Sequence, residues 1–85
     1  MKLEFKQTAL KDFKFWVKKD RKKAKRIIEL LEDIDKNPFD GIGKPEALKY
    51  QLQGKWSRRI DLEHRLVYSI ENDTIVIYSC KYHYK

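Results

Sequence analysis

The apolar residues of this chain follow two different periods, and the single change between them limits its fold more than any other feature. Between residues 8 and 37 they recur at three- and four-residue spacing, which is typical of amphipathic helices. After residue 46 they alternate with polar residues, which is typical of strands with one buried face. The pattern predicts an α+β domain whose helices precede most of its strands.

The first part is predicted to hold a short strand at residues 2–5 and two antiparallel helices. Thr8 is expected to cap the first helix and Asp20 the second, and Asn37 followed by Pro38 ends the second. Their apolar positions are expected to pack in the core rather than to line a ligand site. These positions are Leu10, Phe13, Trp16 and Val17, then Ala24, Ile27, Ile28, Leu31 and Ile34.

Residues 38–46 hold both prolines and two of the three glycines, so an ordered loop is expected there. The rest is predicted to be an antiparallel meander of strands at 56–62, 64–70 and 74–84, with a turn at 71–73. We therefore expect one domain over residues 1–85, with the two helices on one face of an antiparallel β-sheet. The other face is left for binding.

Charge and composition restrict the class of partner. Twenty Lys and Arg against thirteen Asp and Glu give a net charge of +7, which favours a polyanion without choosing among RNA, DNA, a membrane surface and an acidic protein. Nine of the cations lie in residues 11–26. The chain has no export signal pattern and no apolar run long enough for a bilayer, so we expect a cytoplasmic protein with no membrane association. The lone Cys80 is expected to be a reduced, buried thiol.

Polar residues that the strand pattern does not explain gather after the loop. They are Glu46, Lys49, Arg58, Arg59, His64, Arg65, Lys81, His83 and Tyr84. Cations with an exposed aromatic ring suit single-stranded nucleic acid, although a solvated charged sheet face would have the same composition. No metal or cofactor is expected, because Cys80 and His83 would point to opposite faces of a strand and residues 41–44 lack the spacing of a phosphate-binding loop.

Five short motifs carry a resemblance to a known family. They are Gly43-Lys44-Pro45-Glu46, Leu48-Lys49, Gly54-Lys55-Trp56-Ser57-Arg58-Arg59-Ile60, Glu63-His64-Arg65-Leu66-Val67-Tyr68 and Tyr82-His83-Tyr84. In order and spacing they resemble the signature of YoeB-type toxins, within the RelE/ParE superfamily of type II toxin-antitoxin systems. The resemblance implies a RelE-like microbial ribonuclease fold and a ribosome-dependent endoribonuclease that cuts mRNA in the A site. It also implies a YefM-like antitoxin as partner, and it leaves monomer or homodimer open.

Roles for six residues follow from that resemblance. Glu46 is the candidate general base and His83 the general acid, while Arg65 would stabilise the phosphorane. Tyr84 would orient or stack on the substrate, and Lys49 with Arg59 would contact phosphates. These types fit metal-independent cleavage by the RNA's own 2′-OH, which gives a 2′,3′-cyclic phosphate and a 5′-OH. Lys85 after Tyr84 departs from the family pattern, and His64 is interpreted as structural.

Two other functions remain open at the level of sequence. The first is a non-catalytic poison of DNA gyrase similar to ParE, whose members lack this combination of Glu, Arg and His-Tyr. The second is an RNA-binding module that docks without cutting. Such a module would not need a carboxylate such as Glu46 among the cations that bind phosphate. The antitoxin's identity and the codon preference cannot be read from the sequence.

Overall fold

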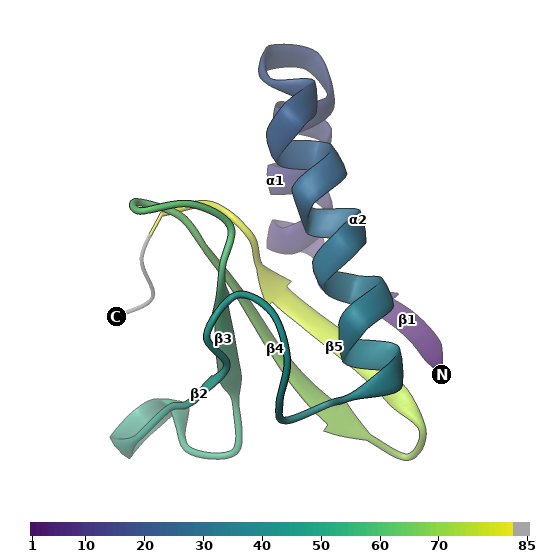
Figure 1. Ribbon diagram of the computed structural model, residues 1–85, viewed down its shortest axis with the longest axis vertical. Helices are drawn as coiled ribbons and strands as arrows, with labels where there is room; N and C mark the ends of the chain where they lie inside the picture. The colour runs from purple at the N-terminus through teal and green to yellow at the C-terminus, as the bar shows by residue number, and fades with distance from the viewer. Residues whose placement is uncertain (83–85) are drawn as a thin grey trace.

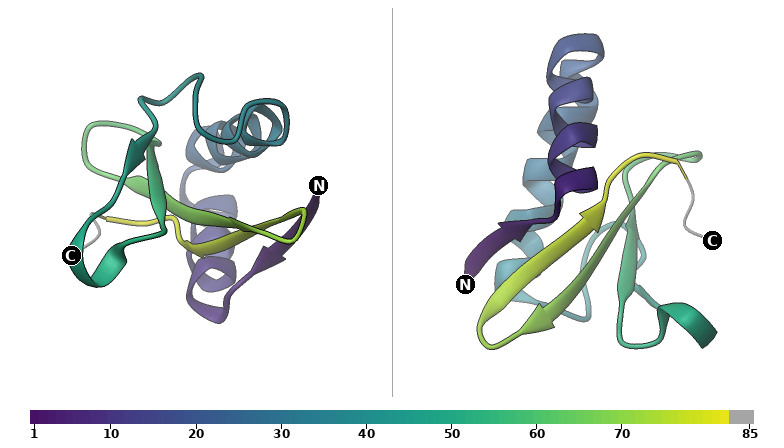
Figure 2. Two further views of the ribbon diagram at one scale, coloured as in Figure 1. Left: turned by 90° about the horizontal axis from the view of Figure 1, so that it is seen from below. Right: turned by 180° about the vertical axis from the view of Figure 1, so that it is seen from behind.

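The computed structural model of the 85-residue chain describes residues 1–82. In chain order its elements are β1 Lys2–Phe5, α1 Gln7–Lys19, α2 Arg21–Lys36, β2 Glu46–Ala47, the short 3₁₀ helix η1 Tyr50–Leu52, β3 Trp56–Arg59, β4 Arg65–Glu71 and β5 Thr74–Ser79. Figure 1 shows α1 and α2 alongside each other next to the twisted strands, and Figure 2 shows the pair from two other sides.

The strands form one sheet in the order β1-β5-β4-β3-β2. The strands from β2 to β5 pair antiparallel, as the meander predicts, whereas β1 runs parallel to β5. The α+β fold is therefore confirmed, but the expectation of a wholly antiparallel sheet is wrong at this edge. The direction of β1 follows from the helix after it: Lys6 N–H donates to the carbonyl of Ile77 at 2.8 Å, and α1 then packs against β5.

Two strands end earlier than the alternation predicts, and side-chain acceptors explain both ends. Beyond β3, the Asp61 carboxylate accepts the backbone N–H groups of Glu63 and His64 at 2.8 and 2.7 Å, which forms a turn. Beyond β5, Cys80 N–H donates to the Asp12 carboxylate at 3.0 Å instead of to a strand. The part of the predicted strand at residues 83 and 84 lies outside the described residues.

The core lies between the helix pair and one face of the sheet. Its largest contributions are Trp16 from α1, Ile27, Leu30 and Ile34 from α2, Leu66 and Tyr68 from β4, and Ile75 and Ile77 from β5. Each such side chain contributes roughly 1.5–3 kcal/mol through the apolar surface it buries.

The predicted helix stripes are right for most positions but wrong for three. Leu10, Val17 and Ile28 are 42, 43 and 47% exposed. Only a narrow stripe of α1 meets the sheet, and positions 9, 13 and 16 occupy it at helical spacing. The cap of α1 also differs, because the helix begins after Lys6 rather than Thr8.

The second helix begins and ends where the sequence predicts. The Asp20 carboxylate accepts Lys22 N–H at 3.2 Å, and α2 ends at Lys36 with Asn37 as its C-cap. No helix in the described part of the chain is long and apolar enough to cross a membrane.

Candidate functional site

The register of the sheet brings three predicted site residues onto one face. Arg59 pairs with Arg65 across β3 and β4, and Glu46 pairs with Ser57 across β2 and β3. Ser57 and Arg59 are two residues apart on β3, so their side chains point the same way. This face is opposite the one that Leu66 and Tyr68 bury against the helices.

Glu46, Arg59 and Arg65 line a common hollow of about 280 Å³ together with Lys44, Pro45 and Ser57. We call it the Arg65 hollow. The Arg65 guanidinium is oriented in part by its own turn, since Nη1 donates to the carbonyl of Asp61 at 3.2 Å. One carboxylate beside three cations can take a proton from a ligand while the cations bind an anionic group of the same ligand.

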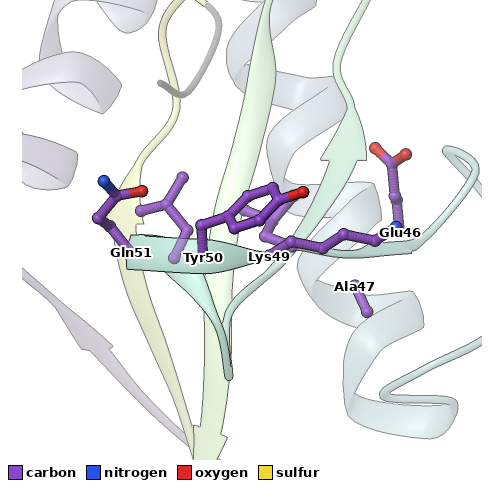
Figure 3. A pocket seen from close by; sticks show the side chains of 7 residues that line it. Glu46, Ala47, Lys49, Tyr50 and Gln51 are labelled. Atoms are coloured by element: carbon purple, nitrogen blue, oxygen red, sulfur yellow. The ribbon is translucent and has the colours of Figure 1, made fainter.

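Lys49 lies in a neighbouring hollow rather than in the first. This second hollow, of about 370 Å³, is formed by residues 46–52, and we call it the Tyr50 hollow. Figure 3 shows its side chains, with Lys49, the residue before η1, extending in the direction of Glu46. Glu46 lines both hollows, so the two cavities meet at the candidate base.

The candidate acid His83 and Tyr84 lie outside the described residues, as does Lys85. The chain that leads to them is described as far as Tyr82, and both backbone polar groups of Tyr82 are held by His64 and by Arg65, the first residue of β4. Tyr82 N–H donates to His64 Nδ1 at 2.6 Å, and Arg65 N–H donates to the carbonyl of Tyr82 at 3.0 Å. The described chain therefore ends against the backbone of Arg65.

His64 is confirmed as a buried structural side chain. It is 6% exposed, and its ring packs edge-on against Trp16 at 4.7 Å between centroids. Because its Nδ1 accepts a hydrogen bond, that nitrogen carries no proton in this arrangement.

Arg58 is not on the binding face, and this is a correction to the sequence analysis, which grouped it with the site residues. It is fully buried on the helix side of β3. Its five N–H donors all have acceptors: the Asp33 carboxylate, the Tyr68 hydroxyl, and the carbonyls of Asn37, Asp40 and Ile42. A buried guanidinium is stable only when it is paired and hydrogen-bonded in this way.

Arg58 fixes the loop that delivers Glu46 to β2. The loop folds around the Arg58 guanidinium, which binds three of its carbonyls. Further along the loop, the carbonyl of Gly43 accepts Arg59 N–H at 2.7 Å. A Cβ on Gly43, where φ is +80°, would lie 2.8 Å from Leu30 Cδ2, so this contact requires glycine. The burial of Arg58 could have been predicted from the strand alternation, because Arg58 is two residues from Trp56 and therefore points to the same, apolar face of the strand.

The described residues contain no metal-type cluster and no reactive thiol. No group of three or more His, Cys, Asp or Glu side chains in residues 1–82 is arranged to hold a metal ion. Cys80 is free and buried, as predicted, and burial, with a smaller effect of Asp12, raises the pKa of its thiol to about 12.

The fold is the RelE/YafQ-like toxin fold. The YafQ structure from E. coli shares the fold with a TM-score of 0.74 at 20% identity, over 95% of this chain and 91% of that one. Residues 5–84 match the family model described as "YoeB-like toxin of bacterial type II toxin-antitoxin system". The chain belongs to this family, as the motifs predicted.

Relatives along the full length support the assignment. Toxin YoeB of Escherichia coli K12 is 46% identical over 84 residues, which cover 99% of this chain and 100% of that protein. Toxin YoeB of Mycobacterium bovis is 50% identical over 82 residues, or 96% of each chain. The Staphylococcus aureus toxin, in a heterotetrameric YoeB–YefM complex, has a TM-score of 0.92 and 49% identity over 99% of this chain and 98% of that one.

Proposed function

We propose that this toxin is a metal-independent endoribonuclease that cuts mRNA in the ribosomal A site. The observation that carries the proposal is the Arg65 hollow, where Glu46 shares one cavity with Arg59, Arg65 and Lys44. RNA offers what such a cavity binds: a phosphate for the cations and a neighbouring 2′-OH for the carboxylate.

The reaction needs three actions at one phosphodiester. A base removes the 2′-OH proton, cations stabilise charge on the non-bridging oxygens, and an acid protonates the departing 5′-oxygen. In the proposal Glu46 is the base and Arg65 stabilises the phosphorane, with Arg59 and Lys49 as further phosphate contacts. The 2′-oxygen bonds to phosphorus as the bond to the 5′-oxygen breaks, which leaves a 2′,3′-cyclic phosphate and a 5′-OH.

His83 and Tyr84 take the remaining roles, as the family resemblance implies. His83 would donate the proton to the 5′-oxygen, and Tyr84 would orient the substrate. The hydrogen bond between Arg65 N–H and the Tyr82 carbonyl supports this assignment, because the residue before His83 is held at the strand that carries Arg65.

The test is a substrate without the nucleophile. Replacing the ribose 5′ of the scissile phosphate by 2′-deoxyribose should abolish cleavage of ribosome-bound mRNA, while the phosphate contacts remain. Removal of loosely bound metal by a chelator, at levels that keep the ribosome assembled, should leave cleavage unchanged. Product ends are read by their resistance or sensitivity to phosphatase and kinase.

Each contrary result indicates a different function. Undiminished cutting of the deoxy substrate would require attack by water and would remove the role of Glu46 as base for the 2′-OH. Failure to cut any RNA, with or without ribosomes, would favour a gyrase poison or a binding module.

We further propose that a YefM-like antitoxin binds this chain and that the toxin forms a homodimer. Solved structures of the Staphylococcus aureus relative are described as a YoeB–YefM complex and as a YoeB dimer. The net charge of +7 on this chain favours an acidic antitoxin segment.

A further inference from the structure

Tyr50 is the most exposed aromatic side chain in the described part of the chain, and its backbone conformation is unfavourable. The residue is 85% exposed, and its φ of +58° lies in the left-handed region, which bulky residues rarely adopt. Three backbone bonds of 3.0–3.1 Å hold the turn, from Leu52, Gln53 and Lys55 to the carbonyls of Lys49, Tyr50 and Leu52. The fold therefore maintains an ordered turn whose aromatic ring contributes almost nothing to the core.

The ring lies on the side of the turn that faces the candidate base. Tyr50 lines the Tyr50 hollow together with Glu46 and Lys49. Figure 3 shows the ring extending from η1 along Lys49, with its hydroxyl directed toward the Glu46 side. A flat apolar ring beside a lysine is the combination that binds an unpaired nucleobase together with its backbone.

The two hollows meet at Glu46, and a single ribonucleotide has matching geometry. Its ribose carries the 2′-OH, the base and the 3′-phosphate as three neighbouring substituents. With the 2′-OH at Glu46 and the 3′-phosphate in the Arg65 hollow, the base is left to occupy the Tyr50 hollow. We propose that Tyr50 is a stacking platform for the base of the nucleotide immediately 5′ of the scissile phosphate.

This inference rests on the proposed function. It adds to that function a role for the Tyr50 ring, which positions the nucleotide whose 2′-oxygen attacks. A ring that holds the base restricts rotation of the ribose and keeps the 2′-oxygen near Glu46. Stacking accepts every base, because each has a π-face, and larger bases gain more from it.

A double-mutant cycle on ribosome-bound mRNA tests the contact. One arm is Tyr50→Ala, and the other is an abasic nucleotide 5′ of the scissile phosphate, with single-turnover cleavage as the readout. Loss of stacking should slow each arm by about 5- to 150-fold. The combined arms should be hardly slower than either alone, since ring and base make the same contact.

Three further variants separate stacking from other causes. Tyr50→Phe and Tyr50→Trp keep a ring and should cleave at close to the wild-type rate. Ile28→Ala removes a side chain that is 47% exposed on α2, across the sheet from the hollows, and should leave cleavage unchanged. The melting temperature of Tyr50→Ala should match that of the wild type, because the ring has almost no buried surface to lose.

Two results would overturn the inference while leaving the proposed function standing. One is a wild-type rate for Tyr50→Ala. The other is an effect of Tyr50→Ala that simply multiplies the effect of the abasic nucleotide, which would place the ring against ribosomal RNA or a second copy of the toxin. A wild-type toxin that cuts no ribosome-bound mRNA would instead remove the proposed function, and this inference with it.

Discussion

A single buried arginine determines how the loop before Glu46 is held. Arg58 uses every donor of its guanidinium on α2, β4 and the loop, so these three segments of the chain meet at one side chain of β3. Removing one partner of a buried ion pair lowers the free energy of unfolding by more than the intact pair contributes to it. The polar groups that remain are then buried without hydrogen-bond partners.

We predict that Arg58→Met lowers the free energy of unfolding by about 3–5 kcal/mol. The neighbouring Arg59→Met serves as the matched control and should lower the free energy of unfolding by no more than about 1 kcal/mol. Arg59 points to the open face, so its removal leaves no buried acceptor without a hydrogen-bond donor. Urea unfolding of the two variants and the wild type gives both values. Equal losses would contradict the role assigned to Arg58.

The partner of Arg58 makes stability depend on pH. The Arg58 hydrogen bond, and then that from Ile42 N–H, hold the pKa of Asp33 below its ordinary value of 3.8. A carboxyl with a lowered folded pKa stabilises the fold above the unfolded pKa, and this stabilisation is lost as the pH falls through the folded pKa.

We therefore predict that Asp33→Asn lowers the free energy of unfolding at pH 7, and that the deficit shrinks as the pH drops below about 4. Denaturant unfolding of both proteins between pH 7 and pH 2.5 measures the difference. A deficit that stays constant over this range would show that the carboxylate charge is not the source of the stabilisation.

At the scale of elements, α1 acts as the support for the end of β5. Trp16 Nε1 donates to the carbonyl of Cys80 at 2.8 Å, and the Asp12 carboxylate accepts Cys80 N–H at 3.0 Å. These contacts turn the chain out of the sheet toward β4, where His64 and Arg65 hold Tyr82. A helix at one end of the sequence thus positions the segment that leads to His83 at the other.

Asp12→Ala should therefore reduce cleavage by more than its loss of stability explains. The variant removes a charged acceptor and should cost about 1.5–3 kcal/mol. Asp20→Ala is the control, because it removes the cap of α2 at a cost of about 0.5–2 kcal/mol without touching Cys80. Single-turnover cleavage and hydrogen exchange at Cys80 and Tyr82 are measured for both. Equal cleavage rates in the two variants would show that this anchor does not affect the site.

On the whole molecule, cations occupy both sides of the fold. Nine Lys and Arg lie in residues 11–26 on the two helices, while Lys44, Arg59 and Arg65 line the hollow on the opposite sheet face. In the proposed function the helical cations are available for ribosomal RNA and the hollow for the cleaved strand. In the same proposal, an antitoxin needs to cover only the hollow to stop cleavage.

We expect the antitoxin to place an acidic segment along the Arg65 hollow and to block or rearrange Glu46, Arg65 and His83. That segment should be disordered when free and ordered when bound. Hydrogen exchange of the toxin should slow in residues 44–47 and 57–67 on binding, and the association rate should fall steeply with salt. A complex that leaves the hollow open, with its geometry unchanged, would contradict this mode of inhibition.

The local pattern of the sequence was enough for the order of the main elements and for the family. The change of period predicts helices first and strands afterwards, Asp20 and Asn37 mark the ends of α2, and the five motifs identify the family. These are short-range properties, because caps, turns and side-chain periodicity depend on neighbours within one or two turns of chain. The roles of Glu46, Arg65, His83 and the other site residues remain predictions.

Tertiary structure alone decided which polar residues share a face and which edge β1 joins. Arg58 and Arg59 are adjacent in sequence, yet one is buried against Asp33 and the other lines the Arg65 hollow. Lys49 falls in the Tyr50 hollow because η1 interrupts the chain after β2. Such outcomes depend on strand register and on contacts between distant segments, and a shift of one residue in register would reverse every side chain on a strand.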